Sequence, residues 1–193
     1  GELVFAVRKL NNNFYRSFGL IFNLTKTEAG IMFFGSTKDL RVGQRIFRTK
    51  QRLFIPVGTK ILGRIIDSIG SPLDGLKKIK TKYASLAEKK GPGIITRGSV
   101  NKPLHTGILV VDCLFPIGRG QRELIIGNKQ TGKTSIALTS IISQNIDSDL
   151  YNKKKYLYCI YVAIGQRKSS VAKIYSIFKN TKALEYTTII AAT

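Results

Sequence analysis

The sequence has few of the side chains from which many catalytic and metal sites are built. Among 193 residues there are one histidine, two cysteines, one methionine and no tryptophan. His105 alone cannot supply a histidine-based triad or a multi-histidine metal site. Cys113 and Cys159 lie inside apolar runs and lack C-x-x-C spacing, so both are expected to be reduced core residues.

Acidic residues are also scarce, with 11 Asp and Glu against 32 Lys and Arg, for a net charge of +21. Such an excess favours nucleic acid or an anionic membrane as a partner. Much of it lies in short clusters at 77–82, 88–90 and 153–155, a pattern typical of solvated loops. We therefore prefer a solvated surface to a nucleic-acid site. A third interpretation is a component of an assembly whose other components carry compensating acid.

Long hydrophobic runs are missing as well. No uncharged apolar run reaches the length of about 18 residues that indicates a membrane-spanning helix. The first residues, GELVF, lack the basic-then-apolar order of a signal peptide. We therefore expect a chain that neither spans a membrane nor carries an export signal. The apolar content of 43% suffices for a buried core in one or two domains.

One motif dominates the sequence. Residues 127–134, GNKQTGKT, fit the phosphate-binding pattern G-x-x-x-x-G-K-[ST]. The motif has the context that it requires, because residues 122–126 are an apolar strand candidate and a helix is predicted over 133–145. Backbone N–H groups and the helix N-terminus would then face an anion. The alternative is a plain strand-to-helix turn.

The motif assigns a role to each of its polar groups. Lys133 is expected to reach the outer phosphates of a nucleoside triphosphate, and the Thr134 hydroxyl to ligand the accompanying Mg²⁺. No residue of this chain is assigned a catalytic role. The predicted nucleotide contacts are Gly127, Gln130, Thr131, Gly132, Lys133, Thr134 and Ser135.

Residues 1–57 are predicted to form part of a small N-terminal β-barrel or sandwich. Short β-rich runs at 3–7, 17–23, 30–34 and 45–55 are divided by turn-forming segments. Aromatic residues in this region could form a stacking platform for single-stranded nucleic acid. We prefer core positions for most of them, because they sit in predicted strands. They are Phe14, Tyr15, Phe18, Phe22, Phe33 and Phe34.

The second domain is predicted over residues 58–193. Residues 76–105 are basic and turn-rich, which predicts an irregular surface connection. The β-α-β units that follow comprise strand 122–126, helix 133–145, strand 156–163, helix 169–182 and strand 186–192.

Two features of these units predict how they pack. Within the second helix, Val171, Ile174, Tyr175 and Phe178 form an apolar stripe at helical spacing. The strands are nearly continuous in apolar residues, which predicts that both sheet faces are covered. The predicted fold class is an α/β P-loop domain, incomplete at the C-terminus because no later strand ends in an Asp that could hold Mg²⁺.

Several segments together resemble the alpha subunits of rotary (F-type) ATP synthases, at 57–58, 62–67, 70–75, 116–124 and 127–134. The resemblance runs nearly end to end. It implies a RecA-like domain behind a β-barrel, in a ring of alternating alpha and beta subunits around a central stalk. It also implies a non-catalytic subunit that binds ATP or ADP with Mg²⁺. Such a subunit supports proton-driven ATP synthesis at the neighbouring beta subunits, meets the membrane only through the complex and binds no nucleic acid.

The chain departs from this family in two ways. The family continues with a second acid on the Mg²⁺ side, an arginine that reaches the neighbouring site and a helical domain, so we expect an N-terminal part, or half of a split subunit that a C-terminal alpha fragment completes. Asn128 and Lys129 replace the usual Asp-Arg, but the Gly, Lys and Thr of the loop are intact, so nucleotide binding should survive.

The cellular location follows from residue usage. The Lys-, Asn- and Ile-rich sequence shows no transit peptide, which favours a mitochondrially encoded protein in the matrix-facing head at the inner membrane. A bacterial or plastid source is the alternative.

Two other functions are weighed against the alpha subunit. One is a RecA-like RNA-dependent motor of the transcription-terminator type, which would use the positive charge on phosphates. The other is the catalytic partner subunit or a secretion ATPase, which should carry Glu where this chain has Gln166. The alpha-like string at 165–169, GQRKS, argues against both. A plain polar loop residue is the alternative reading of Gln166.

Overall fold

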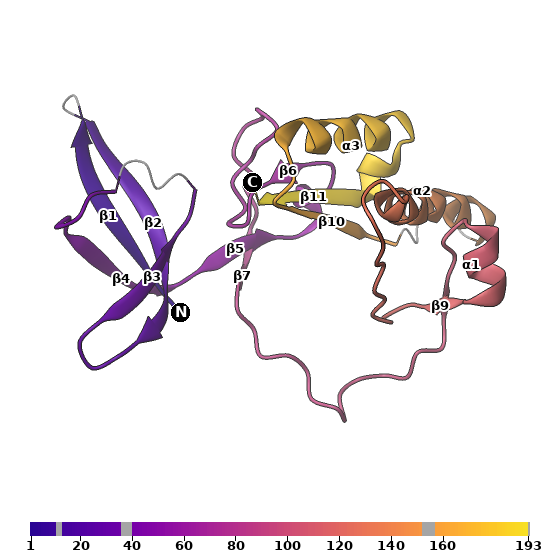
Figure 1. The fold of residues 1–193 in the computed structure, drawn as a ribbon, viewed down its shortest axis with the longest axis horizontal. Coiled ribbons are helices and arrows are strands. Elements are labelled where there is room, and N and C mark those ends of the chain that lie inside the picture. The colour runs from indigo at the N-terminus through magenta and orange to yellow at the C-terminus, as the bar shows by residue number, and fades with distance from the viewer. Residues whose placement is uncertain (11–12, 36–39, 152–156, 193) are drawn as a thin grey trace. The chain divides into compact units, whose positions relative to one another are not determined.

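The computed structural model describes residues 1–10, 13–35, 40–151 and 157–192, in two units (Figure 1). The first unit comprises Gly1–Ile55 together with Tyr83–Gly91, and the second comprises Pro56–Lys82 together with Pro92–Thr193. Part of the predicted irregular connection therefore belongs to the N-terminal unit.

The N-terminal unit is built on an antiparallel sheet of four strands, in the order β3-β2-β1-β4. β1 (Glu2–Leu10) pairs with β2 (Asn13–Leu24) and with β4 (Ile46–Arg52), and β3 (Ala29–Phe33) pairs with β2. The predicted β-rich start is confirmed. β3 and β4 are the edges of this sheet, which is open as far as the described residues extend.

The predicted core positions of the N-terminal aromatic residues are wrong for four of the six. Phe14, Tyr15, Phe18 and Phe22 are 69%, 56%, 38% and 70% exposed. Successive side chains of a strand point to opposite faces, and an open sheet of a single layer leaves them uncovered. The remaining two, Phe33 and Phe34, are partly buried.

A second ladder follows the four-stranded sheet. β5 (Phe54–Val57) pairs with β7 (Tyr83–Leu86), and the Ala87 N–H donates to the Leu53 carbonyl over 2.9 Å. The residues between 76 and 105 are thus less irregular than predicted, because a strand partner is available at this point.

The second unit contains a parallel sheet in the order β10-β11-β6, with helices beside it (Figure 1). The strands are β6 (Ile65–Ile66), β10 (Cys159–Ile164) and β11 (Thr187–Ala192); the helices are α2 (Lys133–Tyr151) and α3 (Lys168–Asn180), with 3-10 turns at Thr59–Ile61 and Ala183–Tyr186. α1 (Leu109–Leu114) and the short pair β8 (Pro103–Leu104) and β9 (Ile117–Gly118) precede α2. The predicted alternation of strands and helices after residue 133 is confirmed.

The core of this unit lies between the sheet and α3. Val171, Ile174 and Phe178 are at most 5% exposed and pack with Ala163 and Ile189, while Tyr175 is partly buried against the same cluster. The predicted apolar stripe is confirmed. Burying each large apolar side chain contributes about 1.5–3 kcal/mol, which stabilises the packing of this helix on the sheet.

Two strand predictions are wrong. Residues 122–126 form no strand, and Leu124 and Ile126 are 82% and 85% exposed. A strand needs a neighbour to satisfy its backbone N–H and C=O groups, and no neighbour lies beside this segment among the described residues. β10 is an edge strand for the same reason. Ile160, Val162 and Ile164 are therefore 60%, 51% and 76% exposed, so both faces are not covered.

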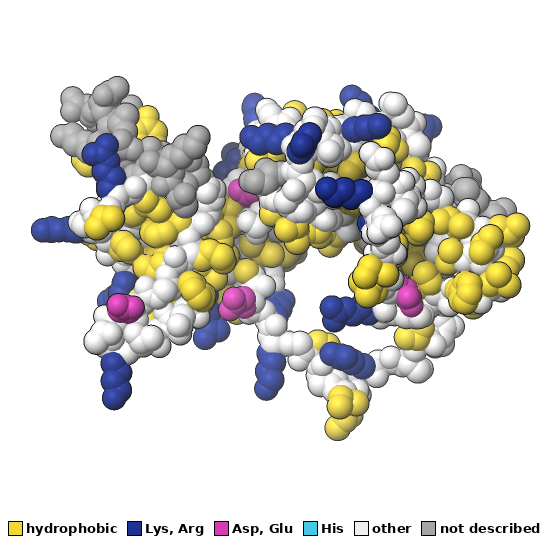
Figure 2. All heavy atoms as spheres, viewed as in Figure 1, with side chains coloured by type: hydrophobic (Ala, Val, Ile, Leu, Met, Phe, Trp, Pro, Cys, Tyr) yellow, Lys and Arg dark blue, Asp and Glu magenta, His cyan; other side chains and the backbone are white. Residues whose placement is uncertain are grey.

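The exposure of Cys113 and of the lysine clusters can be compared with the predictions. Cys113 is exposed on α1 rather than buried as predicted, since the described residues leave this side of the short helix open. The lysines of 77–82 and 88–90 are exposed, as predicted, whereas 153–155 lie outside the described residues. Figure 2 shows many Lys and Arg side chains and few Asp and Glu on one face. No helix of the described part is long and apolar enough to cross a membrane.

Candidate nucleotide-binding site

The loop at 127–134 leads directly into α2. The first backbone hydrogen bond of the helix runs from Ile136 N to Gly132 O over 3.1 Å. The N–H groups of Lys133, Thr134 and Ser135 therefore lie in the first turn, where a helix does not use its own amides. Amides in this position and the positive end of a helix dipole are suited to an anion.

The sign of the backbone φ angle alternates along the loop. Gln130 and Gly132 have φ angles of 62° and 88°, in the left-handed region that favours glycine. Such alternation turns successive N–H groups toward one concave side. Gly127 is required for a different reason, since a Cβ there would lie 2.9 Å from Thr131 Oγ1.

Side chains of the motif converge on the start of the loop. The Lys133 ammonium donates to the Gly127 carbonyl over 2.6 Å and to the Asn128 carbonyl, and Thr131 Oγ1 donates to Asn128 O over 2.9 Å. Lys133 thus sits in the loop that a phosphate would enter, held by carbonyl oxygens. Gln130, Thr134 and Ser135 are exposed, so their polar groups are accessible to a ligand.

Buried polar residues hold α2 in place. Ser143 Oγ and Gln144 Nε2 both donate to the His105 carbonyl, over 3.0 and 2.8 Å, and Gln144 is 3% exposed. Gly107, with φ 74°, passes so close to the helix that a Cβ would lie 2.8 Å from Ser143 Cβ. This support was not predicted from the sequence, in which Gly107 is its one signal.

Asp112 on α1 stabilises the same segment. Its carboxylate accepts the Thr106 hydroxyl over 2.6 Å and the N–H groups of Thr106 and Gly107 over 2.9 and 3.0 Å. These hydrogen bonds, the Thr106 hydroxyl first, lower the pKa of Asp112. Asp112 therefore fixes the turn that carries Gly107 to the loop helix. No sequence motif predicts this role of Asp112.

Gln166 follows the end of β10. Gly165, with φ 65°, donates its N–H to Ala192 O over 3.0 Å, and this turn brings the Gln166 amide back to Tyr161, whose hydroxyl accepts from Nε2 over 3.2 Å. In α/β sheets, ligands bind outside the carboxyl ends of parallel strands. The position is therefore suited to a group that meets a ligand.

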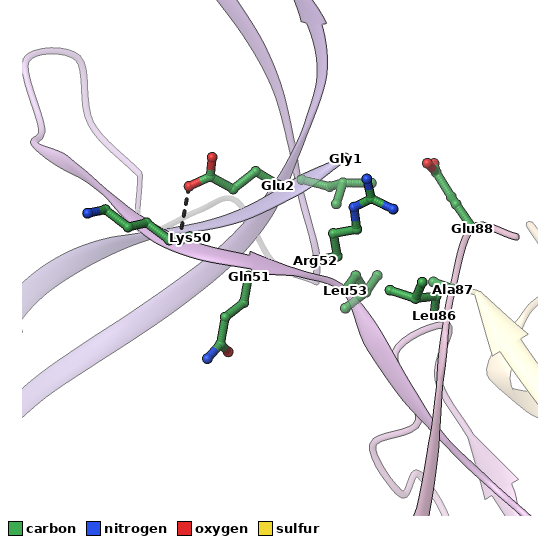
Figure 3. Close-up of a pocket in the computed structure, with 10 residues that line it drawn as sticks. Gly1, Glu2, Lys50, Gln51, Arg52, Leu53, Leu86, Ala87 and Glu88 are labelled. Atoms are coloured by element: carbon green, nitrogen blue, oxygen red, sulfur yellow. Dashed lines mark hydrogen bonds between the residues drawn. The ribbon is translucent and has the colours of Figure 1, made fainter.

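A pocket of about 570 Å³ lies in the N-terminal unit and is lined by residues 1–2, 20, 50–53 and 86–88 (Figure 3). Of its two acids, Glu2 and Glu88, Glu2 accepts the Lys50 N–H over 3.0 Å and pairs with Arg48 over 2.7 Å. The hydrogen bond from Arg48 is the main reason that the pKa of Glu2 is lowered. Lys50, at φ 57°, lies where the β1–β4 register shifts. These charged groups stabilise a β-bulge, and we assign the pocket no ligand.

A loop of this sequence that leads directly into a helix, in a unit with a parallel sheet, is typical of P-loop nucleotide-binding proteins. Residues 107–193 match the ATP synthase alpha/beta family, nucleotide-binding domain. This part of the chain belongs to that family.

Relatives extend the match beyond this domain. The chain is 53% identical over 175 residues to the ATP synthase subunit alpha of Neorickettsia sennetsu. It is 48% identical over 175 residues to that of Rickettsia bellii and 44% identical over 177 residues to that of Jannaschia sp.. The matches cover 90–91% of this chain and 34–35% of each relative. The chain thus spans about a third of the length of these relatives, and the resemblance to alpha subunits is confirmed. All three organisms are bacteria, so a mitochondrial origin is not shown.

Proposed function

We propose that this chain binds a magnesium nucleotide, ATP or ADP, at residues 127–135 and acts as a non-catalytic alpha-type subunit of an ATP synthase. The observation that carries the proposal is the convergence of the Lys133 ammonium and the first-turn amides of α2 on one loop. A phosphate entering this loop would replace the Gly127 and Asn128 carbonyls as the partner of Lys133, because opposite charges attract more strongly than a charge and a dipole.

The chain's own residues fit a magnesium nucleotide. Gly127, Gln130, Thr131 and Gly132 would shape the phosphate loop, the amides of Thr134 and Ser135 would donate to it, and the Thr134 hydroxyl would ligand the metal. No group of three or more His, Cys, Asp or Glu side chains suited to a metal occurs among the described residues. The ion would therefore be held mainly by the nucleotide's own oxygens. When bound, it neutralises phosphate charge.

We propose that this site does not hydrolyse its nucleotide, because residue 166 is a glutamine. An amide at the end of β10 can hydrogen-bond to a water molecule, but it cannot accept the proton of that water at neutral pH. The site would then retain nucleotide, and synthesis would take place at a neighbouring subunit.

The surroundings of the chain are part of the same proposal. The relatives are named ATP synthase subunit alpha, which supports beta subunits and a central stalk as partners, with the membrane reached only through the complex. We further propose that the open N-terminal sheet forms part of a β-barrel, that a complementary alpha fragment covers the bare side of β10, and that the complex is mitochondrial.

Replacing Lys133 tests the proposal. In the assembled complex, Lys133→Ala should weaken magnesium-ATP binding at this site at least about tenfold, the value of a charge-assisted hydrogen bond. Lys129→Ala is the matched control, because it removes one positive charge from an exposed position of the same loop, and binding should stay within about twofold in view of salt screening. Equilibrium dialysis that found the Lys133→Ala site filled as in the wild type would overturn the proposal.

A further inference from the structure

The Tyr161 ring is fixed by the core of the second unit. It packs edge-on against Phe178, with ring centroids 6.2 Å apart and an interplanar angle of 75°, and Phe178 is fully buried. On β10, Tyr161 lies opposite Ile189 of β11, which is also fully buried. The hydroxyl of this ring therefore occupies a defined place at the end of a rigid side chain.

The backbone of Gln166 is fixed on both sides. Before it, Gly165 is tied to Ala192 of β11. After it, the Arg167 carbonyl accepts the N–H groups of Ser170 and Val171 over 2.9 and 3.2 Å, which begins α3. Gln166 can therefore move mainly through its side-chain torsions. The hydrogen bond from Nε2 to the Tyr161 hydroxyl restricts these torsions.

We propose that Tyr161 is a positioning residue of the nucleotide site, whose hydroxyl holds the Gln166 amide in the orientation that meets bound nucleotide. The inference rests on the proposed function. With Nε2 on the tyrosine, the carbonyl Oε1 is the acceptor left for a water molecule or a hydrated cation beyond the end of β10. Through Gln166, Tyr161 therefore contributes to how long the site retains nucleotide, without touching the nucleotide itself.

The test uses the assembled complex and a fluorescent ATP with Mg²⁺. Tyr161→Phe keeps the ring and removes only the hydroxyl, so the dissociation rate should rise about two- to tenfold, the range of one neutral hydrogen bond, with the thermal midpoint unchanged. Tyr175→Phe, which removes a hydroxyl from a ring beside the same core, should leave the rate unchanged. In a Gln166→Ala background, Tyr161→Phe should have no further effect.

The outcomes separate the two proposals. Suppose that Lys133→Ala loses nucleotide binding while Tyr161→Phe has the same dissociation rate as Tyr175→Phe. The positioning role of Tyr161 is then overturned, and the proposed nucleotide site is retained. If Lys133→Ala binds nucleotide as the wild type does, the proposed nucleotide site is wrong, and the positioning role of Tyr161 is wrong with it. An equal effect of Tyr161→Phe with and without Gln166 shows a merely structural role and also overturns positioning.

A second pair of variants serves if Tyr161→Phe does not assemble. Gln166→Met is close to glutamine in size but cannot donate to the hydroxyl, and it should release nucleotide faster. Gln166→Glu should retain a non-hydrolysable magnesium nucleotide, because the tyrosine hydroxyl can rotate and donate to a carboxylate. Release by Gln166→Met at the wild-type rate would overturn the proposal.

Discussion

Single charged side chains fix turns of the second unit, and the pair of Arg64 and Asp74 shows how. Arg64 Nε and Nη2 donate to the Asp74 carboxylate over 2.5 and 3.0 Å, and the two side chains are 16% and 4% exposed. The same carboxylate accepts the Leu76 N–H over 3.0 Å. Asp74 lies in the turn at 70–75, and Arg64 directly precedes β6. Their ion pair therefore holds the turn against the start of this strand.

Neutralising Asp74 should loosen this turn. The hydrogen bond from Arg64 is the main reason that the pKa of Asp74 is lowered, so the stability it contributes is complete above the ordinary carboxyl pKa of about 3.9. It is lost as the pH falls through the lowered value. Asp74→Asn should cost about 1–3 kcal/mol at pH 7 and remove this acid dependence. Amide hydrogen exchange across 64–76 measures both, and wild-type protection in the variant would contradict the account.

The two cysteines should differ in reactivity. Burial raises the pKa of Cys159 to about 11, so at pH 8 about one in a thousand of its thiols is ionised, whereas Cys113 is exposed. N-Ethylmaleimide should therefore label Cys113 much faster than Cys159. Peptide mass spectrometry of a labelling time course reads both sites, with Cys113→Ser as the control. Equal labelling rates would show that the burial of Cys159 is wrong.

At the scale of elements, the sequence predicted what local spacing determines. The start of α2 follows from the loop motif, and the buried side of α3 follows from the 3.6-residue period of Val171, Ile174 and Phe178. The state of residues 122–126 could not be predicted, because a strand depends on a neighbour that its own sequence does not specify. The contacts of Asp112 with Thr106 and of Gln166 with Tyr161 were missed because neither pair forms a known motif.

The contact of Gly107 with α2 provides a prediction at this scale. Gly107→Ala would place a Cβ 2.8 Å from that of Ser143 at φ 74°, which should cost about 1–3 kcal/mol of stability. Gly98→Ala is the matched control, since a Cβ there meets nothing within 4 Å. Hydrogen exchange of α2 in the assembled complex should rise in the first variant alone. Equal protection in both would show that the close approach is absent.

At the scale of the whole molecule, apolar side chains remain uncovered in both units. Examples are Phe22 at 70%, Leu124 at 82%, Ile126 at 85% and Ile164 at 76%. Edge strands and apolar patches of this kind promote association. The structure is therefore suited to a component of a larger assembly.

Expressed alone, residues 1–193 should aggregate or unfold over a broad temperature range. The reason is that folding leaves these apolar side chains in water and so forgoes part of the stabilisation from burial. Calorimetry and light scattering on the isolated chain measure this. A monomer with one sharp two-state transition would contradict the prediction.

Retention of nucleotide by this chain without hydrolysis can be tested in the intact complex. The most direct measurement disables the P-loop lysine of the neighbouring catalytic subunits in the intact complex, loads the complex with γ-labelled magnesium ATP and follows a single turnover. We expect the label to stay bound as ATP at the site of Lys133, and we expect Lys133→Ala to abolish the bound fraction. Release of labelled phosphate from this site, or wild-type retention in Lys133→Ala, would contradict this expectation.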